Sequence, residues 1–258
     1  MNTNKSSPVL ADMPNTMDPE EWLVRVDLAA CYQLFNYFGW TDIIFNHISV
    51  SVPNKKDQFL INGFGLLYNE VTAENLVKVD IDGNVISDPT GMGVLPGGFT
   101  IHSAIHMVRP DAQCVMHTHT PATITVSAMD RGLMRLTQHA MRFTNRIAYH
   151  NYDGAFFNDE ERKRLQKNLG NKMVMLLRNH GTLVCGRTIA EAFDTMYYLE
   201  RACQTQVIMM STGEKLIEPT MLVGDQVASM FESPGRKAKG GDQIWPAMMR
   251  LLKQNIAH

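Results

Sequence analysis

The sequence lacks the marks of several large classes of protein. Its 258 residues carry a formal net charge of −2, so they offer no excess of basic side chains for nucleic acid. The 4 cysteines form no CxxC pair and lie in apolar or helical contexts, which favours free buried thiols in a reducing compartment. No apolar run approaches the roughly 18 residues that span a bilayer, and residues 1–15 lack a signal-peptide pattern. We therefore expect a cytoplasmic protein with neither a nucleic-acid nor a membrane partner.

The chain is long enough to bury a sizeable core. Residues 1–17 read as a disordered arm, residues 18–225 as one domain, and residues 226–258 as a C-terminal extension with a short helix. Many short strands interleaved with a few helices indicate an α/β domain with a largely antiparallel sheet. The patterns predict helices over residues 18–38, 99–108, 121–129, 158–170, 188–211 and 245–252, strands over 46–52, 58–62, 147–150, 173–177 and 183–184, a hairpin over 77–86, and a loop over 89–98.

Residues 114–120 are the stretch around which the chain is organised. A short apolar run leads into His117 and His119, two imidazoles separated by one residue. On a strand, the period of two places both rings on the same face, roughly 7 Å apart along the chain. That spacing allows two ring nitrogens to converge on one cation.

A second apolar strand, over residues 173–177, leads to His180 and a turn-making Gly181. Three histidines at strand ends suit a transition-metal site with an open position for water or substrate. Zinc is the expected ion, and Fe(II) and Mn(II) also fit a histidine site. The alternative interpretation is that each histidine is an ordinary hydrogen-bonded side chain.

With these motifs in place, residues 20–220 resemble the class II aldolase/adducin family, most closely its adducin-head branch. The resemblance implies a three-layer α/β/α sandwich with a central, mainly antiparallel sheet. It also implies a homotetramer with sites near subunit contacts, and metal ligands at His117, His119 and His180. The motifs that carry it, in order and spacing, are Asn46–Ser49, Phe64-Gly65, Phe99–Ile105, Arg109–Ala112, His117–Ala122, Tyr149–Gly154 and Arg178–Gly181.

The chain departs from the sugar-phosphate aldolases of that family in three places. Where those enzymes carry two phosphate-binding serines and a glutamate, this chain has Pro96-Gly97-Gly98-Phe99. The Gly-Asn pair of their other phosphate loop is replaced by Asn46-His47, so His47 is expected to line the pocket. The tyrosine acid of those enzymes falls near Gln138-His139. Backbone N–H groups of Gly97 and Gly98 at a helix start still suit an anion, so we expect a small carboxylate or unphosphorylated substrate.

Two further histidines are candidates for the missing catalytic groups. His102 lies one helical turn beyond the position of the absent glutamate. Its expected role is a fourth metal ligand, a base, or a histidine that lies behind the site. His139 replaces the tyrosine as an acid, acting across a subunit boundary, or is a surface histidine. His106 and His150 are expected to be structural. Tyr152 and Asp153 are positioning groups near the site or turn residues, and we favour the turn.

The sequence is compatible with two functions. The first is a metal-dependent carbon–carbon lyase, aldolase- or decarboxylase-like, acting on a small carbonyl or carboxylate. The alternative is a non-catalytic, adducin-like assembly protein with a cytoskeletal role. Adducin heads tend to lose the metal-ligand histidines, whereas all three are present here. The nearest equivalent of the lysine-rich adducin tail is only Arg236-Lys237-Ala238-Lys239.

Overall fold

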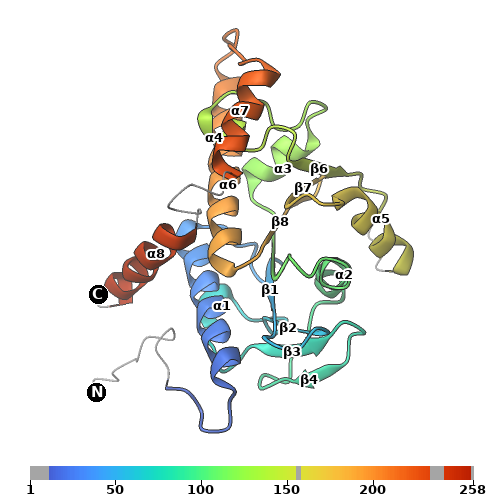
Figure 1. Ribbon diagram of the computed structural model, residues 1–258, viewed down its shortest axis with the longest axis vertical. Coiled ribbons are helices and arrows are strands. Elements are labelled where there is room, and N and C mark those ends of the chain that lie inside the picture. The colour runs from blue at the N-terminus through green and yellow to red at the C-terminus, as the bar shows by residue number, and fades with distance from the viewer. Residues whose placement is uncertain (1–11, 155–157, 233–240, 257–258) are drawn as a thin grey trace.

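A computed structural model describes residues 12–154, 158–232 and 241–256, and its centre is one eight-stranded sheet (Figure 1). The strand order is β4-β3-β2-β1-β5-β8-β7-β6, and every neighbouring pair is antiparallel except β6 with β7. This confirms the predicted α/β fold with a mainly antiparallel sheet. The strands are β1 (His47–Ser51), β2 (Gln58–Ile61), β3 (Val77–Asp80), β4 (Val85–Ser87), β5 (Cys114–Thr118), β6 (Ile147–His150), β7 (Val174–Leu177) and β8 (Gly181–Gly186).

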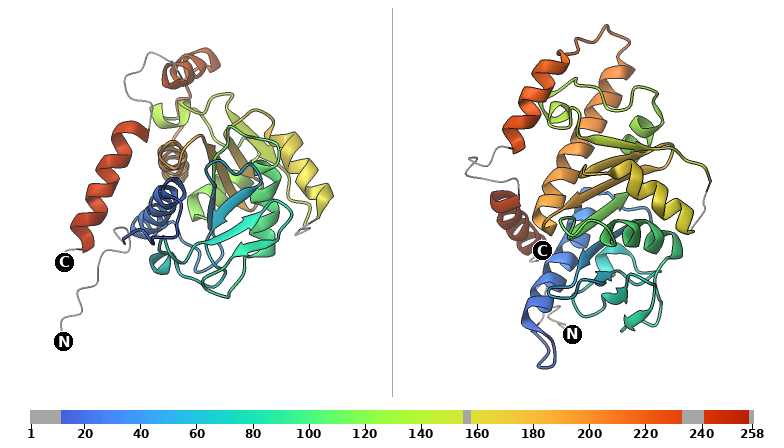
Figure 2. Two further views of the ribbon diagram at one scale, coloured as in Figure 1. Left: turned by 60° about the horizontal axis from the view of Figure 1, so that its bottom comes forward. Right: turned by 45° about the vertical axis from the view of Figure 1, so that its right-hand side comes forward.

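Helices cover both faces of the sheet, as the two views in Figure 2 also show. On one face pack α1 (Pro19–Phe38), α6 (Ile189–Ser211) and α8 (Gly241–Ile256), over the largest apolar cluster of the protein. On the other face pack α2 (Pro96–His106) and α5 (Asp159–Leu169), over two smaller clusters. The remaining helical segments are α3 (Pro121–Ala128), α4 (Gln138–Met141), α7 (Met221–Glu232) and the short 3₁₀ turn Tyr68–Glu70.

The two faces of β5 carry different chemistry because successive side chains point to opposite sides of a strand. Cys114 and Met116 pack into the α1–α6 cluster, whereas Val115 packs toward α2 and α5. By the same alternation His117 lies on the side of α2 and α5. In β1, Ile48 packs with α1, so its neighbours His47 and Ser49 point to the opposite face, toward α2. The sheet therefore places its polar residues between β1, β5 and α2.

Most predicted elements are confirmed, and their caps explain why. Helix α1 begins after Asp18, whose carboxylate accepts from the N–H groups of Glu20 and Glu21, and it ends at Gly39 with φ +71°. The loop predicted for residues 89–98 is wrong at its end, because α2 already begins at Pro96. A proline lacks only an N–H that is unsatisfied in the first turn anyway, so it starts the helix readily.

The C-terminal part differs more from the prediction. Helix α7 was not predicted, and it runs across the expected boundary at residue 225. Helix α8 begins at Gly241 rather than at residue 245, with Pro246 inside its first turns. Residues 233–240, expected to form a loop, and residues 1–11 of the expected arm lie outside the described residues.

Two simpler expectations concern the cysteines and the membrane. Cys31, Cys114, Cys185 and Cys203 are all free and buried, as predicted. Within the described ranges, no helix combines the length and apolar character needed to cross a bilayer.

A buried arginine ties α1 to the segment before β3. Arg25 is 2% exposed, and its guanidinium donates to the carbonyl oxygens of Ala73 and Leu76 at 3.1 Å. It also donates to the Glu21 carboxylate at 2.9 Å, which Lys78 contacts at 2.8 Å. Removal of this one side chain would leave a buried carboxylate and two carbonyl groups poorly satisfied.

We expect Arg25→Met to lower the free energy of unfolding by about 3 kcal/mol in urea denaturation, because breaking a buried ion pair strands its partner. The matched control is Arg187→Met, which removes an exposed pair with Glu191 and should cost no more than about 0.5 kcal/mol. Equal losses of unfolding free energy in the two variants would contradict the argument that the buried ion pair of Arg25 stabilises the fold.

Candidate metal centre

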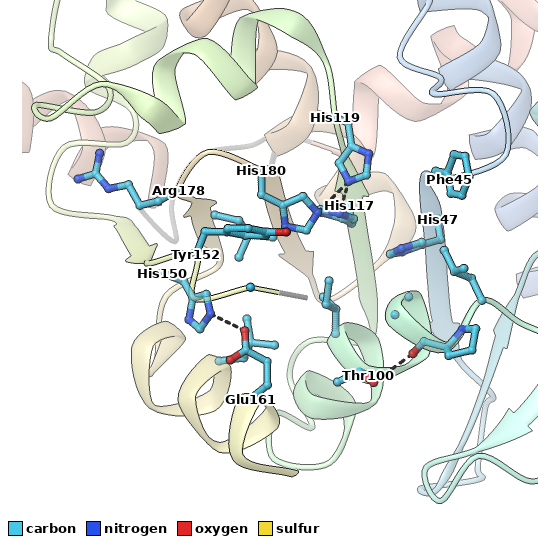
Figure 3. Close-up of a pocket in the computed structure, with 18 of the residues that line it drawn as sticks. Phe45, His47, Thr100, His117, His119, His150, Tyr152, Glu161, Arg178 and His180 are labelled. Carbon is cyan, nitrogen blue, oxygen red and sulfur yellow. Dashed lines mark hydrogen bonds and ion pairs between the residues drawn. The ribbon is translucent and has the colours of Figure 1, made fainter. Parts of the chain in front are cut away.

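Three histidine rings converge at the end of β5 and in the turn between β7 and β8 (Figure 3). The Nε2 atom of His119 lies 2.8 Å from Nε2 of His117 and 3.0 Å from Nε2 of His180. The strand period thus brings His117 and His119 together as expected. These three residues, called the triad below, form a group that could hold a metal ion.

The β7–β8 turn delivers His180 because two positions permit an unusually tight path. Asn179 adopts φ +58°, a left-handed conformation that asparagine tolerates better than most residues. A Cβ atom on Gly181 would lie 2.2 Å from the carbonyl oxygen of Thr118, so only glycine allows β8 to approach β5 here. The close approach sets His180 beside the two histidines of β5.

Hydrogen bonds fix the protons on two of the three rings. Nδ1 of His117 lies 2.9 Å from the carbonyl oxygen of Thr182, which can only accept, so this nitrogen carries the proton. Nδ1 of His119 lies 2.9 Å from a carboxylate oxygen of Asp42 and donates to it in the same way. With the ring proton on Nδ1, the Nε2 atom of each ring offers a lone pair toward the other. A cation between them would relieve this repulsion.

The donor set fits a divalent ion. Nitrogens on one zinc ion lie about 2.0–2.1 Å from it and so about 3.3 Å from each other, close to the spacings in the triad. Hydrogen-bonded outer nitrogens are the usual support of metal-binding histidines. Burial lowers the pKa of His117 well below its ordinary value, and burial with the nearby His119 lowers that of His180 to about 4. Both rings are thus neutral ligands at pH 7.

The triad lies in the wall of a cavity of about 510 Å³. His47, Gly97 and Gly98, which the sequence predicts as substrate-binding residues, all line this cavity. A Cβ on Gly98 would lie 2.7 Å from the His47 ring, so the glycine makes room for that imidazole. Much of the remaining wall is apolar, formed by Phe45, Leu95, Ile101, Leu165 and Leu177.

His102 lies behind His47 rather than in the cavity wall. Its Nε2 is 2.7 Å from Nδ1 of His47, and its Nδ1 contacts Oγ of Ser49. The same hydroxyl contacts Nε2 of His106, whose Nδ1 lies 3.2 Å from Oγ of Ser51. Both nitrogens of His102 are therefore engaged, and this placement does not fit a fourth ligand or a base in direct contact with substrate.

His139 lies on the short helix α4, where its ring packs on Tyr198 at 4.8 Å between centroids. It is not among the residues that line the cavity of its own chain. A role as an acid would therefore require a neighbouring subunit, and it stays a prediction.

Sequence reasoning missed several cavity residues or gave them another role. His150 and Tyr152, expected to be structural and turn residues, both line the cavity together with Asp42, Glu161 and Arg178. Asp42 follows α1 in an irregular segment with no motif of its own. Glu161 is one of three acidic residues in the first turn of α5, where helix capping alone would explain it.

Arg178 is engaged although it lines the cavity. Its guanidinium donates to the carbonyl oxygens of Ser127 and Met129, and it lies 4.4 Å from the centroid of the Tyr149 ring. In Figure 3 it points away from the triad. It is therefore poorly placed to neutralise a phosphate group.

The buried histidines predict a pH-dependent stability. Burial lowers the pKa of His106 to about 4, whereas a histidine in an unfolded chain titrates near about 6.5. As the pH falls between these values, the unfolded chain binds a proton that the folded protein does not, so folding becomes less favourable. In chelator-treated protein, His106→Gln should make the urea-unfolding free energy fall less steeply in this window, by up to about 1.4 kcal/mol per pH unit. An unchanged slope would contradict a neutral, buried His106.

Comparisons with known proteins agree with this geometry. Residues 26–207 match the model of the class II aldolase and adducin N-terminal domain. An aldolase II superfamily protein from Pseudomonas syringae superposes with a TM-score of 0.89 at 45% identity, over 93% of this chain and 96% of that one. L-fuculose 1-phosphate aldolase from Glaciozyma antarctica gives a TM-score of 0.80 at 26% identity, over 96% and 95%. Alpha-adducin of Rattus norvegicus is 40% identical over 91% of this chain, which spans 34% of the adducin.

Proposed function

Because the chain belongs to the class II aldolase and adducin family, we propose that it is a divalent-metal-dependent carbon–carbon lyase. Its substrate would be a small carbonyl or carboxylate compound rather than a sugar phosphate, and the reaction aldolase- or decarboxylase-like. The observation that carries the proposal is the convergence of three Nε2 atoms in the wall of a cavity, with two of the rings held in the tautomer that a metal requires.

The triad of His117, His119 and His180 would hold the ion, with zinc the expected metal and Fe(II) or Mn(II) compatible with the same donors. When bound, such an ion polarises a carbonyl oxygen and stabilises the oxyanion that develops next to it. Asp42 and the Thr182 carbonyl keep two of the rings oriented, and the negative charge of Asp42 offsets part of the charge of the ion.

The first turn of α2 supports an unphosphorylated substrate. Pro96, Gly97 and Gly98 present no hydroxyl group, and the nearby Thr100 hydroxyl is already donated to the Pro96 carbonyl oxygen at 3.1 Å. The cationic Arg178 is engaged by backbone carbonyls. The N–H groups of Gly97 and Gly98 at the start of α2 remain suited to a carboxylate.

His47 would be the polar side chain that meets the substrate beside the triad. Its ring lies 5.0 Å from that of His117, and Gly98 packs against it. His102, which the sequence predicts as a ligand, a base or a histidine behind the site, would act through His47 as a positioning residue. The proposed assembly is a homotetramer, in which His139 of a neighbouring subunit would reach the cavity.

We expect His117→Ala to lose bound metal, because two remaining imidazoles cannot hold an ion in place as three do. The measurement is elemental analysis of protein purified without added chelator. His139→Ala, which removes a histidine that is not part of the triad, is the matched control and should retain the wild-type metal content. Full metal content in His117→Ala would show that the site has been assigned wrongly.

A non-catalytic, adducin-like assembly role is the second proposal, favoured by the 40% identity to alpha-adducin. The intact triad argues against it, because an assembly role gives no reason to keep the Nε2 atoms of His117 and His180 within 3.0 Å of that of His119. Co-sedimentation with actin filaments separates the two functions. We expect no binding at micromolar concentrations, and saturable binding there would favour the assembly role.

A further inference from the structure

A second polar group lies in the same cavity, away from the triad. His150, at the end of β6, and Glu161, in the first turn of α5, both line the cavity. Figure 3 shows Glu161 on the wall across from the triad, with its carboxylate bonded to His150. The apolar side chains of Ile101, Leu165 and Leu177 line the same cavity. The cavity therefore has two separate polar regions and an apolar wall.

Hydrogen bonds orient the Glu161 carboxylate. The side-chain amide of Asn168 donates to Nδ1 of His150 at 3.0 Å, so the proton of the neutral ring is on Nε2. That Nε2–H donates to Oε1 of Glu161 at 2.8 Å. Arg164 lies 3.4 Å from Oε2 of the same carboxylate and also pairs with Asp153. Glu161 is thus held from behind by His150, and it shares Arg164 with Asp153.

This arrangement leaves acceptor capacity unused on the cavity side. An ionised carboxylate offers about four lone-pair sites, and His150 occupies one of them. Two carboxylates, Asp42 and Glu161, line the cavity within the described part of the chain. Asp42 bonds to a histidine of the triad, so Glu161 is the carboxylate that can accept from a ligand at the other polar region.

We propose that Glu161, positioned by His150, accepts a hydrogen bond from a hydroxyl group of the substrate, at the end of the cavity away from the triad. A hydroxyl fits this position because it donates to the carboxylate without bringing a second charge against the apolar wall formed by Ile101 and Leu165. The substrate class is then a small hydroxylated carbonyl or carboxylate compound, with its carbonyl or carboxylate end at the triad. This inference rests on the proposed metal site.

The test uses zinc-loaded protein and pairs of 2-hydroxy acids, which lack the carbonyl needed for cleavage. Each pair differs by one terminal hydroxyl: lactate with glycerate, 2-hydroxybutanoate with 2,4-dihydroxybutanoate, and 2-hydroxypentanoate with 2,5-dihydroxypentanoate. Isothermal titration calorimetry should show at least one terminal hydroxyl strengthening binding by about tenfold, the usual effect of a hydrogen bond to a charged group. Glu161→Gln should reduce this preference to about twofold, without weakening the binding of the acids that lack the terminal hydroxyl.

Glu160→Gln is the matched control, because Glu160 lies next to Glu161 in the same helical turn but is exposed and pairs with Lys163. It should keep the full preference. His150→Gln should keep part of it, as expected if His150 only orients the carboxylate. Zinc content and thermal unfolding are measured for every variant, and Glu161→Ala provides a second substitution should Glu161→Gln fold poorly.

The outcomes separate this inference from the proposed function. Zinc-dependent binding of the acids without a terminal hydroxyl, together with no hydroxyl preference or one that survives Glu161→Gln, would overturn the role of Glu161 and leave the metal site supported. Failure of every acid to bind the zinc-loaded protein would overturn both proposals.

Discussion

The antiparallel pairing of β5 with β8 is the contact on which the candidate site depends. It holds the Thr118 carbonyl so close to Gly181 that no side chain can stand between them. The turn before Gly181 then carries His180 to within 3.0 Å of His119, 61 residues earlier in the chain. Two distant segments are thus brought together as one group of candidate ligands through backbone hydrogen bonds.

The sheet also separates the apolar core on one face from the polar residues of the candidate site on the other. Because side chains alternate across a strand, β1 and β5 bury apolar residues under α1 and α6 and direct their histidines and serines toward α2. The register of the two strands places His47 directly beside His117. A shift of one residue would move every one of these rings into the apolar core. The large cluster on the first face therefore fixes the positions of the polar groups on the second.

The sequence predicts the mainly antiparallel α/β fold from the pattern of its elements, and the resemblance to the family supplies the three-layer arrangement and supports His180 as the third member of the triad. An alternating strand that ends in His117 and His119 can place the two rings only on one face, and the family motifs order the remaining strands. The surroundings of the triad could not be predicted in this way. Asp42 and Glu161 reach the cavity only through tertiary packing, and the acidic start of α5 has a sufficient local explanation in helix capping. His102 was placed on the correct helix face, but the sequence could not show that His47 stands in front of it.

A row of hydrogen bonds runs through His47, His102, Ser49, His106 and Ser51. A neutral imidazole donates from one nitrogen and accepts at the other, so all the bonds run in the same direction where the Ser49 hydroxyl donates to one ring and accepts from the other. In one direction Nε2 of His47 presents a proton to the cavity, and in the other it presents a lone pair. Reversal exchanges donor for acceptor at that atom while every heavy atom stays in place. The imidazole of His47 can thus bind either a ligand that accepts a hydrogen bond or a ligand that donates one.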